Sequence, residues 1–106
     1  MITIDDFKKV EIKIGEIVSV ENIEGSDKLL KLKVNFGTEE RQVLSGIKAY
    51  FPDPQALVGK RCPFVTNLAP RMMMGLESQA MILAAGGTDT PFALFETTGA
   101  PGDTVK

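Results

Sequence analysis

The sequence predicts an all-β domain, and three observations support that prediction. Apolar and polar residues alternate with a period of two, most strictly from Leu30 to Phe36, as in a strand with one buried face. Clusters of Gly, Ser, Asp and Pro separate the apolar segments, as expected for turns between strands. Gly15 interrupts the first long strand, where a glycine is typical of the bend that a small barrel needs.

Length and composition predict a single domain spanning residues 1–106. A hydrophobic content of 43% and a charged content of 25% are ordinary for a soluble globular protein. No apolar run approaches the roughly 18 residues of a membrane span, and the first residues lack a basic region followed by an apolar one. We therefore expect a cytoplasmic protein, or part of a larger cytoplasmic chain, without a membrane partner.

A short helix is predicted at the N-terminus. Thr3 can cap it, and Asp5 and Asp6 in its first turn are favourably placed against the helix dipole. Phe7 and Val10 fall on one face of this helix. We expect the helix to act as a lid for one end of the core.

Three strands follow the predicted helix. The first covers residues 11–20, and a turn at 24–27 leads to the second, within residues 28–36. A turn at 37–40 reverses the chain into the third strand, at 41–45. The last two strands form a hairpin with lysines on its outer face.

A second short helix is predicted next, with Asp53 as its cap, Pro54 as its first residue and Gly59 as its stop. A fourth strand covers 60–67, and a fifth covers 79–85. A further short strand is expected at 92–95, after a turn rich in Gly and Thr.

This order is that of an OB-fold, a five-stranded Greek-key barrel, with short helices at the N-terminus and between strands three and four. The pattern alone leaves open a different small barrel. OB-folds most often bind oligonucleotides or oligosaccharides on the face of strands two and three, where this chain carries Lys31 and Lys33.

Two absences restrict the chemistry. Cys62 is the only cysteine, which excludes an internal disulfide, and its setting is that of a small apolar residue on a strand. The chain has no histidine, the usual ligand of zinc or copper and the commonest general base. We therefore expect no catalytic residue, no metal and no cofactor.

Charge is unevenly distributed along the chain. The net charge is −2, which argues against indiscriminate binding of polyanions. Residues 28–71 nevertheless hold eight bases against three acids, whereas the segment through Asp27 is acidic. An anionic partner on one side of the protein would account for this pattern, and so would a solvated charged face.

Residues 67–85 form the first candidate for a binding surface. Pro70, Arg71, three methionines at 72–74 and Gly75 read as a shaped loop that leads into a buried strand. The other interpretation is that the methionines fill an irregular gap in the core beneath the loop.

Five segments, in this order, carry a resemblance to a known family: residues 4–10, 24–32, 45–47, 67–71 and 77–85. They resemble the tRNA-binding domain attached to the C-terminus of many bacterial methionyl-tRNA synthetases, also found as a free-standing tRNA-binding protein. The resemblance implies an OB-fold, a homodimer and recognition of tRNA by its shape. The catalytic body of a methionyl-tRNA synthetase is a possible further partner.

The resemblance also implies a set of RNA-facing residues: Lys28, Lys31, Arg41, Asn67, Arg71, Ser78 and Met81. Lys33 joins them because it shares the cationic strand face. Cations on a strand face can neutralise phosphates, and Asn and Ser side chains can bond sugars or base edges. The structural alternatives are that Asn67 fixes the loop backbone, Ser78 satisfies a turn and Met81 is core.

This chain departs from the family pattern in the loop. Met72 and Met74 stand where family members usually carry bases, and Ala80 stands where a glycine is common. The loss of two cations should weaken phosphate contact and lower its salt dependence.

The leading hypothesis is a non-catalytic tRNA-binding and dimerisation module of a methionyl-tRNA synthetase, acting in cis or in trans. The alternative is a chaperone-like dimer of the same fold that binds unfolded or secretory peptides. A third possibility is a pure assembly module.

Overall fold

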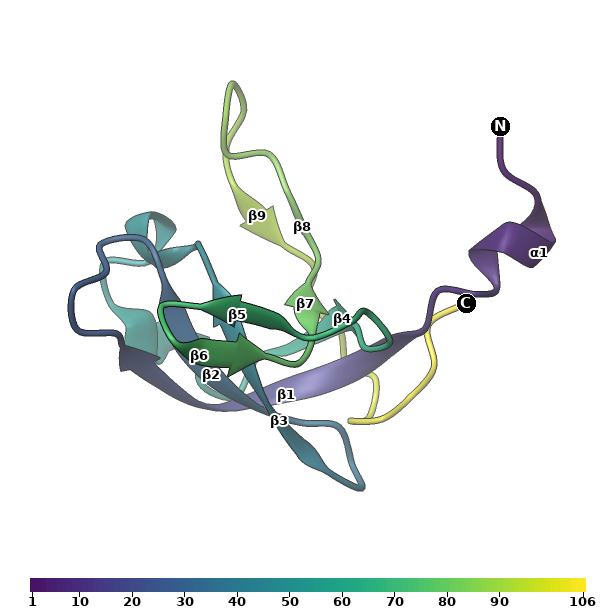
Figure 1. Ribbon diagram of the computed structural model, residues 1–106, viewed down its shortest axis with the longest axis horizontal. Coiled ribbons are helices and arrows are strands. Elements are labelled where there is room, and N and C mark those ends of the chain that lie inside the picture. Colours follow the sequence, from purple (N-terminus) through teal and green to yellow (C-terminus); the bar gives the residue numbers. More distant parts are fainter.

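The computed structural model describes residues 1–106 and is mostly β-sheet (Figure 1). Its main sheet is antiparallel and curled, with the order β3–β2–β1–β4–β7. The strands of this sheet are β1 (Ile12–Asn22), β2 (Leu30–Asn35), β3 (Glu40–Ser45), β4 (Arg61–Val65) and β7 (Met81–Ile82). This confirms the predicted all-β, OB-like fold.

Two smaller sheets and three short helices complete the chain. The pairs of strands are β5 (Arg71–Met73) with β6 (Leu76–Ser78), and β8 (Ala84–Ala85) with β9 (Ala93–Leu94). The helices are α1 (Ile4–Phe7) and the 3-10 helices η1 (Lys48–Tyr50) and η2 (Pro54–Leu57). None of them is long or apolar enough to cross a membrane.

The long strand β1 belongs to both halves of the barrel. Its first half pairs with β4 and its second half with β2, and the register shifts between Ile17 and Ser19. Gly15 lies before this shift, in regular register with Cys62, and an added Cβ there would press on Val34 and lie 2.7 Å from Cε1 of Phe36. The close approach of these side chains requires glycine, whereas the bend predicted at Gly15 is not seen there, since the irregularity of β1 lies between Ile17 and Ser19.

Strand β2 shows the predicted alternation, with its apolar side chains buried and its lysines on the outer face. Phe64 of β4 is fully buried, as predicted, and packs edge-on against Phe36 with ring centroids 5.4 Å apart. Cys62 is also fully buried, and burial, reinforced by Glu96, raises the pKa of its thiol to about 11. The thiol is therefore a packing group and not a nucleophile.

Helix η2 closes one end of the barrel. The Asp53 carboxylate accepts a hydrogen bond from the Gln55 amide, and Pro54 is the first helical residue, as predicted. The helix places Leu57 fully inside the core. Gly59 follows with a φ of +91°, a conformation that stops the helix.

Helix α1 has the predicted cap but not the predicted position. Thr3 and Asp6 form a reciprocal capping box. The lid expectation is wrong, because α1 buries no side chain and Ile4 is 66% exposed. Figure 1 shows the helix projecting beyond the barrel, close to the C-terminal end. Its single turn precedes residues 9–11, whose backbone is held by the Asn67 side chain.

The methionine segment is a hairpin and not an irregular loop. Strands β5 and β6 are joined by the two residues Met74 and Gly75, with φ angles of 51° and 78°. Two successive positive φ angles are typical of a type I′ turn. The sequence concealed this turn because methionine rarely adopts a positive φ. The fifth predicted strand, at 79–85, is split into β7 and β8.

Candidate nucleic-acid interface

The β5–β6 hairpin lies across the free edge of β3. Gln42 and Gln79 exchange bonds, since the Gln79 amide donates to the Gln42 carbonyl at 2.8 Å and the Gln42 amide donates to Oε1 of Gln79 at 2.9 Å. The Leu44 amide donates to the Ser78 hydroxyl at 3.0 Å. These bonds seal the barrel wall beside β3.

The Ser78 side chain is buried between β3 and the hairpin. The residue is only 6% exposed, and its hydroxyl is within hydrogen-bond distance of the carbonyls of Leu44 and Ala80. The contacts of Ser78 are therefore those of a structural residue. Its hydroxyl is already bonded within the protein, and little of the side chain is exposed to a ligand.

Lys31 and Lys33 lie side by side on the outer face of β2. Cross-strand neighbours share a face, so Lys33 lies between Ser19 of β1 and Gln42 of β3. Lys31 pairs with the Glu21 carboxylate at 3.0 Å, whereas Lys33 is exposed and has no ion-pair partner. A shallow groove runs over these side chains. Its lining offers ammonium, hydroxyl and amide groups, which suit phosphates and sugars, together with the carboxylate of Glu21.

Lys28 lies just before β2, in the loop between β1 and β2. Its side chain is exposed and makes no ion pair, and its backbone amide is 3.3 Å from the Ser26 hydroxyl. The tip of the hairpin reaches the same loop, because an added Cβ on Gly25 would lie 3.7 Å from Cε of Met74. The loop and the hairpin therefore border the outer face on which the lysines lie.

Arg41 lies on the opposite side of the sheet from these lysines. It pairs with Val34 in the register, so its side chain shares the core side, with its guanidinium carbon 5.7 Å from the centre of the Phe36 ring. The guanidinium donates to the carbonyls of Thr66 at 2.6 Å and Gln79 at 3.2 Å. The expected grouping of Arg41 with the strand lysines is therefore wrong.

The sequence could not show which face of β3 carries Arg41. Val43 and Leu44 are both buried, one inside the barrel and one beneath the hairpin, so the third strand shows no alternation. Only the register with β2 assigns Gln42 to the lysine face. Ser19, Glu21 and Gln42 are polar groove residues that were not predicted from the sequence.

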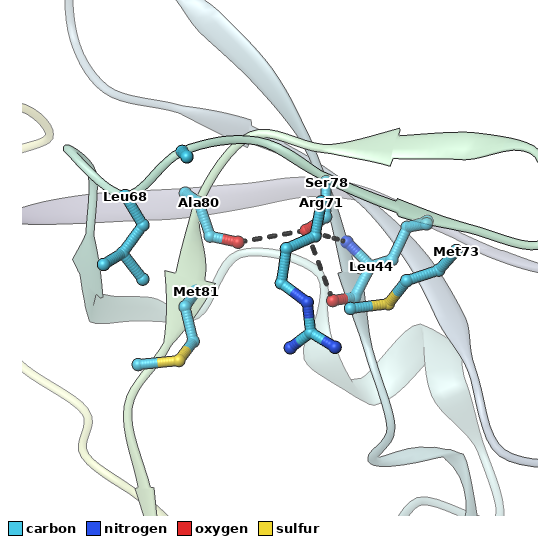
Figure 2. Close-up of a pocket in the computed structure, with 8 residues that line it drawn as sticks. Leu44, Leu68, Arg71, Met73, Ser78, Ala80 and Met81 are labelled. Carbon is cyan, nitrogen blue, oxygen red and sulfur yellow. Dashed lines mark hydrogen bonds between the residues drawn. The ribbon is translucent and has the colours of Figure 1, made fainter.

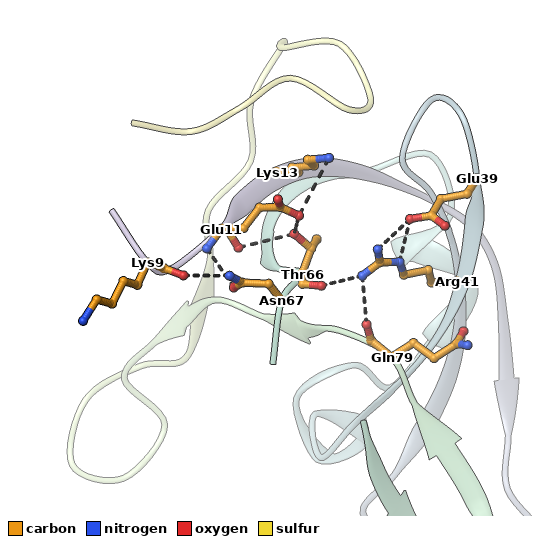
Figure 3. A network of polar contacts seen from close by, with 8 residues as sticks. All are labelled: Lys9, Glu11, Lys13, Glu39, Arg41, Thr66, Asn67 and Gln79. Atoms are coloured by element: carbon orange, nitrogen blue, oxygen red, sulfur yellow. Dashed lines mark hydrogen bonds and ion pairs between the residues drawn. The ribbon is translucent and has the colours of Figure 1, made fainter. Parts of the chain in front are cut away.

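Asn67 holds the N-terminal segment in place (Figure 3). Its Oδ1 accepts from the Glu11 amide at 2.8 Å, and its Nδ2 donates to the Lys9 carbonyl at 2.7 Å. Both polar atoms of the side chain are thus bonded to backbone that lies between α1 and β1. These contacts are those expected if Asn67 fixes the backbone instead of binding RNA.

Thr66 extends the same network toward the barrel. Its hydroxyl donates to the Glu11 carboxylate at 2.6 Å, and this bond is the main cause of a lowered pKa for Glu11. Desolvation opposes the shift, and the charges of Lys13 and Arg41 support it. The network therefore favours the ionised carboxylate.

Arg71 lies in a separate, mostly apolar pocket (Figure 2). Residues 71 and 73 share a face of the hairpin with Ser78, and this face is turned toward Leu44. The lining residues are Leu44, Leu68, Ala69, Arg71, Met73, Ser78, Ala80 and Met81. Arg71 has no ion-pair partner, and Met81 is exposed at the rim and is not core.

Met72 and Met74 lie on the outer side of the hairpin, with exposed fractions of 68% and 56%. These are the two positions at which family members usually carry bases. The outer side of the hairpin is therefore apolar where cations were expected.

The predicted set thus divides into three groups. Lys28, Lys31 and Lys33 gather around the outer face of β2, and Arg71, Ser78 and Met81 meet in the pocket. Arg41 and Asn67 belong to a polar network at the other side of the wall, which Figure 3 shows in full. No three Cys, Asp or Glu side chains are clustered so that they could hold a metal ion.

Comparison with known proteins gives the family context. The family described as "Putative tRNA binding domain" matches residues 12–103. A MetRS-related protein from Pyrococcus horikoshii is 36% identical, with a TM-score of 0.93, over 100% of this chain and 98% of that chain. The CsaA chaperone protein from Picrophilus torridus is 27% identical, with a TM-score of 0.87, over the full length of both chains.

A third structure shares the fold. The C-terminal domain of Plasmodium vivax p43 is 24% identical, with a TM-score of 0.82, over 94% of this chain and 61% of that chain.

Proposed function

Because the chain belongs to the tRNA-binding domain family, we propose that it is a non-catalytic tRNA-binding and dimerisation module. In this proposal it serves a methionyl-tRNA synthetase, as a C-terminal domain, a beta subunit or a free-standing homologue. The similarity over full length to the MetRS-related protein supports this assignment.

The observation that carries the proposal is the cationic outer face of β2. Lys33 is free of any carboxylate, and Lys31 needs only to exchange Glu21 for a phosphate. Lys28 extends the cationic surface into the neighbouring loop. Ser19 can bond sugar hydroxyls, which distinguish RNA from DNA, and so can Oε1 of Gln42, whose Nε2 already donates to the Glu77 carbonyl at 2.9 Å.

Recognition by shape follows from the small number of these groups. Three lysines and two polar side chains cannot read a long sequence, but they can match a set of backbone phosphates. Affinity from so few cations is modest, and a homodimer would double them. Attachment to a synthetase would raise the effective concentration of tRNA at its active site.

The test is binding of unfractionated tRNA at two salt concentrations, about 50 and 200 mM, for the native protein and a Lys31→Gln, Lys33→Gln variant. We expect the variant to bind at least about tenfold more weakly at the lower salt, with a salt slope smaller by about 2. Lys106→Gln is the control, since it removes one exposed positive charge far from the groove. Absence of tRNA binding by the native protein at both concentrations would overturn the proposal.

The exposed methionines support a second candidate, a chaperone-like dimer that binds unfolded peptides. Met72 and Met74 form an adaptable apolar surface on the outside of the hairpin. Salt distinguishes the candidates, because peptide binding to this surface should be insensitive to ionic strength and tRNA binding should not.

A further inference from the structure

Tyr50 is an exposed aromatic residue outside the lysine groove. It is the last residue of η1 and the only tyrosine of the chain, and it is 43% exposed. Phe7 and Phe95 are the other exposed aromatic residues, but neither forms a pair with another ring. Only Tyr50 is therefore both open to solvent and supported by a second aromatic ring.

The Tyr50 ring is held on one face and at its hydroxyl. The ring stacks on Phe92 with centroids 4.2 Å apart and planes 5° from parallel, and the hydroxyl donates to the Gly87 carbonyl at 3.0 Å. Phe92 is held edge-on by Phe51, and both of these rings pack against the core. Because Phe92 covers one face of the tyrosine ring, its exposed part is the opposite face with the adjoining edges. A ring held in this way loses little freedom when a ligand stacks on it.

Lys28 and Lys48 lie close together at the start of η1. The Lys48 amide donates to the Lys28 carbonyl at 3.2 Å, and Nζ of Lys48 is 3.4 Å from the Ser26 carbonyl. The helix that ends at Tyr50 is thus held against the loop between β1 and β2. Neither lysine forms an ion pair, although this loop also contains acids. Since Lys28 borders the outer face of β2, the surface around Tyr50 adjoins the proposed RNA surface.

An aromatic ring with cations beside it suits single-stranded nucleic acid. Every base has a π face, so an aromatic side chain stacks on an unpaired base of any identity, and lysines neutralise the phosphates of the strand. A base inside a duplex is covered by its neighbours, so a stacking side chain selects nucleotides that are unpaired and unstacked. An apolar peptide side chain would contact the ring but would leave the two lysines without a partner.

We propose that Tyr50 stacks on one unpaired nucleotide of the bound tRNA, while Lys28 and Lys48 bind phosphates next to it. The inference rests on the proposed tRNA binding and specifies the kind of RNA element that is bound. The ring adds affinity without base specificity, because its hydroxyl proton is already donated to the Gly87 carbonyl. The lysine groove matches the shape of the RNA backbone, and Tyr50 detects a single-stranded loop or end beside it.

Intrinsic fluorescence tests the stacking directly. It reports on this site alone, because Tyr50 is the only tyrosine and the chain has no tryptophan. At low salt, a short single-stranded oligouridylate should quench the fluorescence in a saturable manner, and a blunt RNA duplex with the same number of phosphates should quench it much less. N-acetyltyrosinamide mixed with each RNA corrects for light absorbed by the bases. Equal quenching by the two RNAs, or no quenching by an RNA that binds, would overturn the inference.

Variants separate stacking on RNA from packing on Phe92. Tyr50→Leu keeps an apolar side chain against Phe92 but removes the ring, and we expect it to bind tRNA and oligouridylate at least about fivefold more weakly. Tyr50→Phe keeps the ring and loses only the bond to Gly87, so its affinity should stay close to that of the native protein. Phe95→Leu is the matched control, since it removes an exposed ring that precedes the acidic Glu96. Urea denaturation checks that each variant is folded.

The outcomes distinguish this inference from the proposed function. If the native protein binds neither tRNA nor oligouridylate, the proposed function fails and the inference fails with it. If tRNA binding depends on Lys31 and Lys33 but Tyr50→Leu binds as the native protein does, only the inference is wrong. The same holds if Tyr50→Phe loses as much affinity as Tyr50→Leu, because the hydroxyl bond and not the ring then matters. If an unfolded peptide quenches the fluorescence and RNA does not, the occupant is a peptide and the inference is wrong.

Discussion

Two arginines that the sequence placed in one binding set lie in contrasting regions of the molecule. Arg41 is part of a saturated network, with two carbonyl acceptors, the Glu39 carboxylate at 2.6 Å and the Phe36 ring. Arg71 lies in an apolar pocket and has no polar partner. The same side chain is a structural brace in one region and an available charge in the other.

The difference shows that the register, and not the residue type, decides what a cation does. Arg41 faces inward because it pairs with Val34, and there the protein supplies all its acceptors. Arg71 faces a pocket built from Leu and Met side chains, which supply none. A guanidinium without acceptors is available to a ligand, whereas one with a complete set is not.

The largest expected effect comes from removing the brace. Arg41→Ala leaves two carbonyls without a donor, so we expect a loss of about 2 to 3 kcal/mol in the free energy of unfolding. Urea denaturation measures it. Arg71→Ala is the matched control, with an expected change within about 0.5 kcal/mol. Equal losses in the two variants would remove the contrast between the regions.

Ser78 combines features of the two regions. It lines the pocket of Arg71, but its hydroxyl is hydrogen-bonded within the protein, as the Arg41 guanidinium is. Ser78→Ala leaves the buried Leu44 amide without its acceptor, and we expect a loss of about 1 to 2 kcal/mol in stability. Thermal or urea unfolding gives the value. Unchanged stability combined with weaker tRNA binding would instead return Ser78 to the RNA-facing set.

The smallest effect concerns acid stability of the network. The pKa of Glu11 is lowered in the folded protein, chiefly by the Thr66 hydroxyl, from an ordinary value of 4.5. Its contribution to stability is therefore present above about pH 4.5 and is lost as the pH falls through the lowered folded-state pKa. Glu11→Gln should flatten the decline of stability as the pH falls below about 4.5. An unchanged pH profile in this variant would mean that another carboxylate is responsible.

Much of the fold could be predicted from local patterns. The strict alternation in β2 and the sequence Asp53-Pro54 before a helix are confirmed by the structure. The break predicted at Gly15 lies instead between Ile17 and Ser19, and Gly15 is needed for close packing. The hairpin was missed because its turn begins with Met74, in a conformation that methionine rarely adopts. The lid was wrong because capping signals specify a helix start but not what the helix packs against.

The site was less predictable, since it depends on contacts between distant segments. The lysines of β2 could be placed on one face from their spacing alone. Asn67 bonds to the backbone of residues 9 and 11, and Arg41 bonds to the backbone of residues 66 and 79. These partners are distant in the sequence, so no local pattern could predict that the two side chains are structural. The pocket likewise combines β3, the hairpin and β7, which only the folded chain brings together.

The shared strand β1 has a mechanical consequence. Since one continuous strand pairs with β4 through its first half and with β2 through its second, neither half of the barrel can detach without pulling on the other. At Gly15 the side chains of Val34 and Phe36 pack directly against the β1 backbone, which joins the two halves of the barrel closely. We therefore expect local opening to be confined to the hairpins and the two chain ends, and the main sheet to unfold as one cooperative unit.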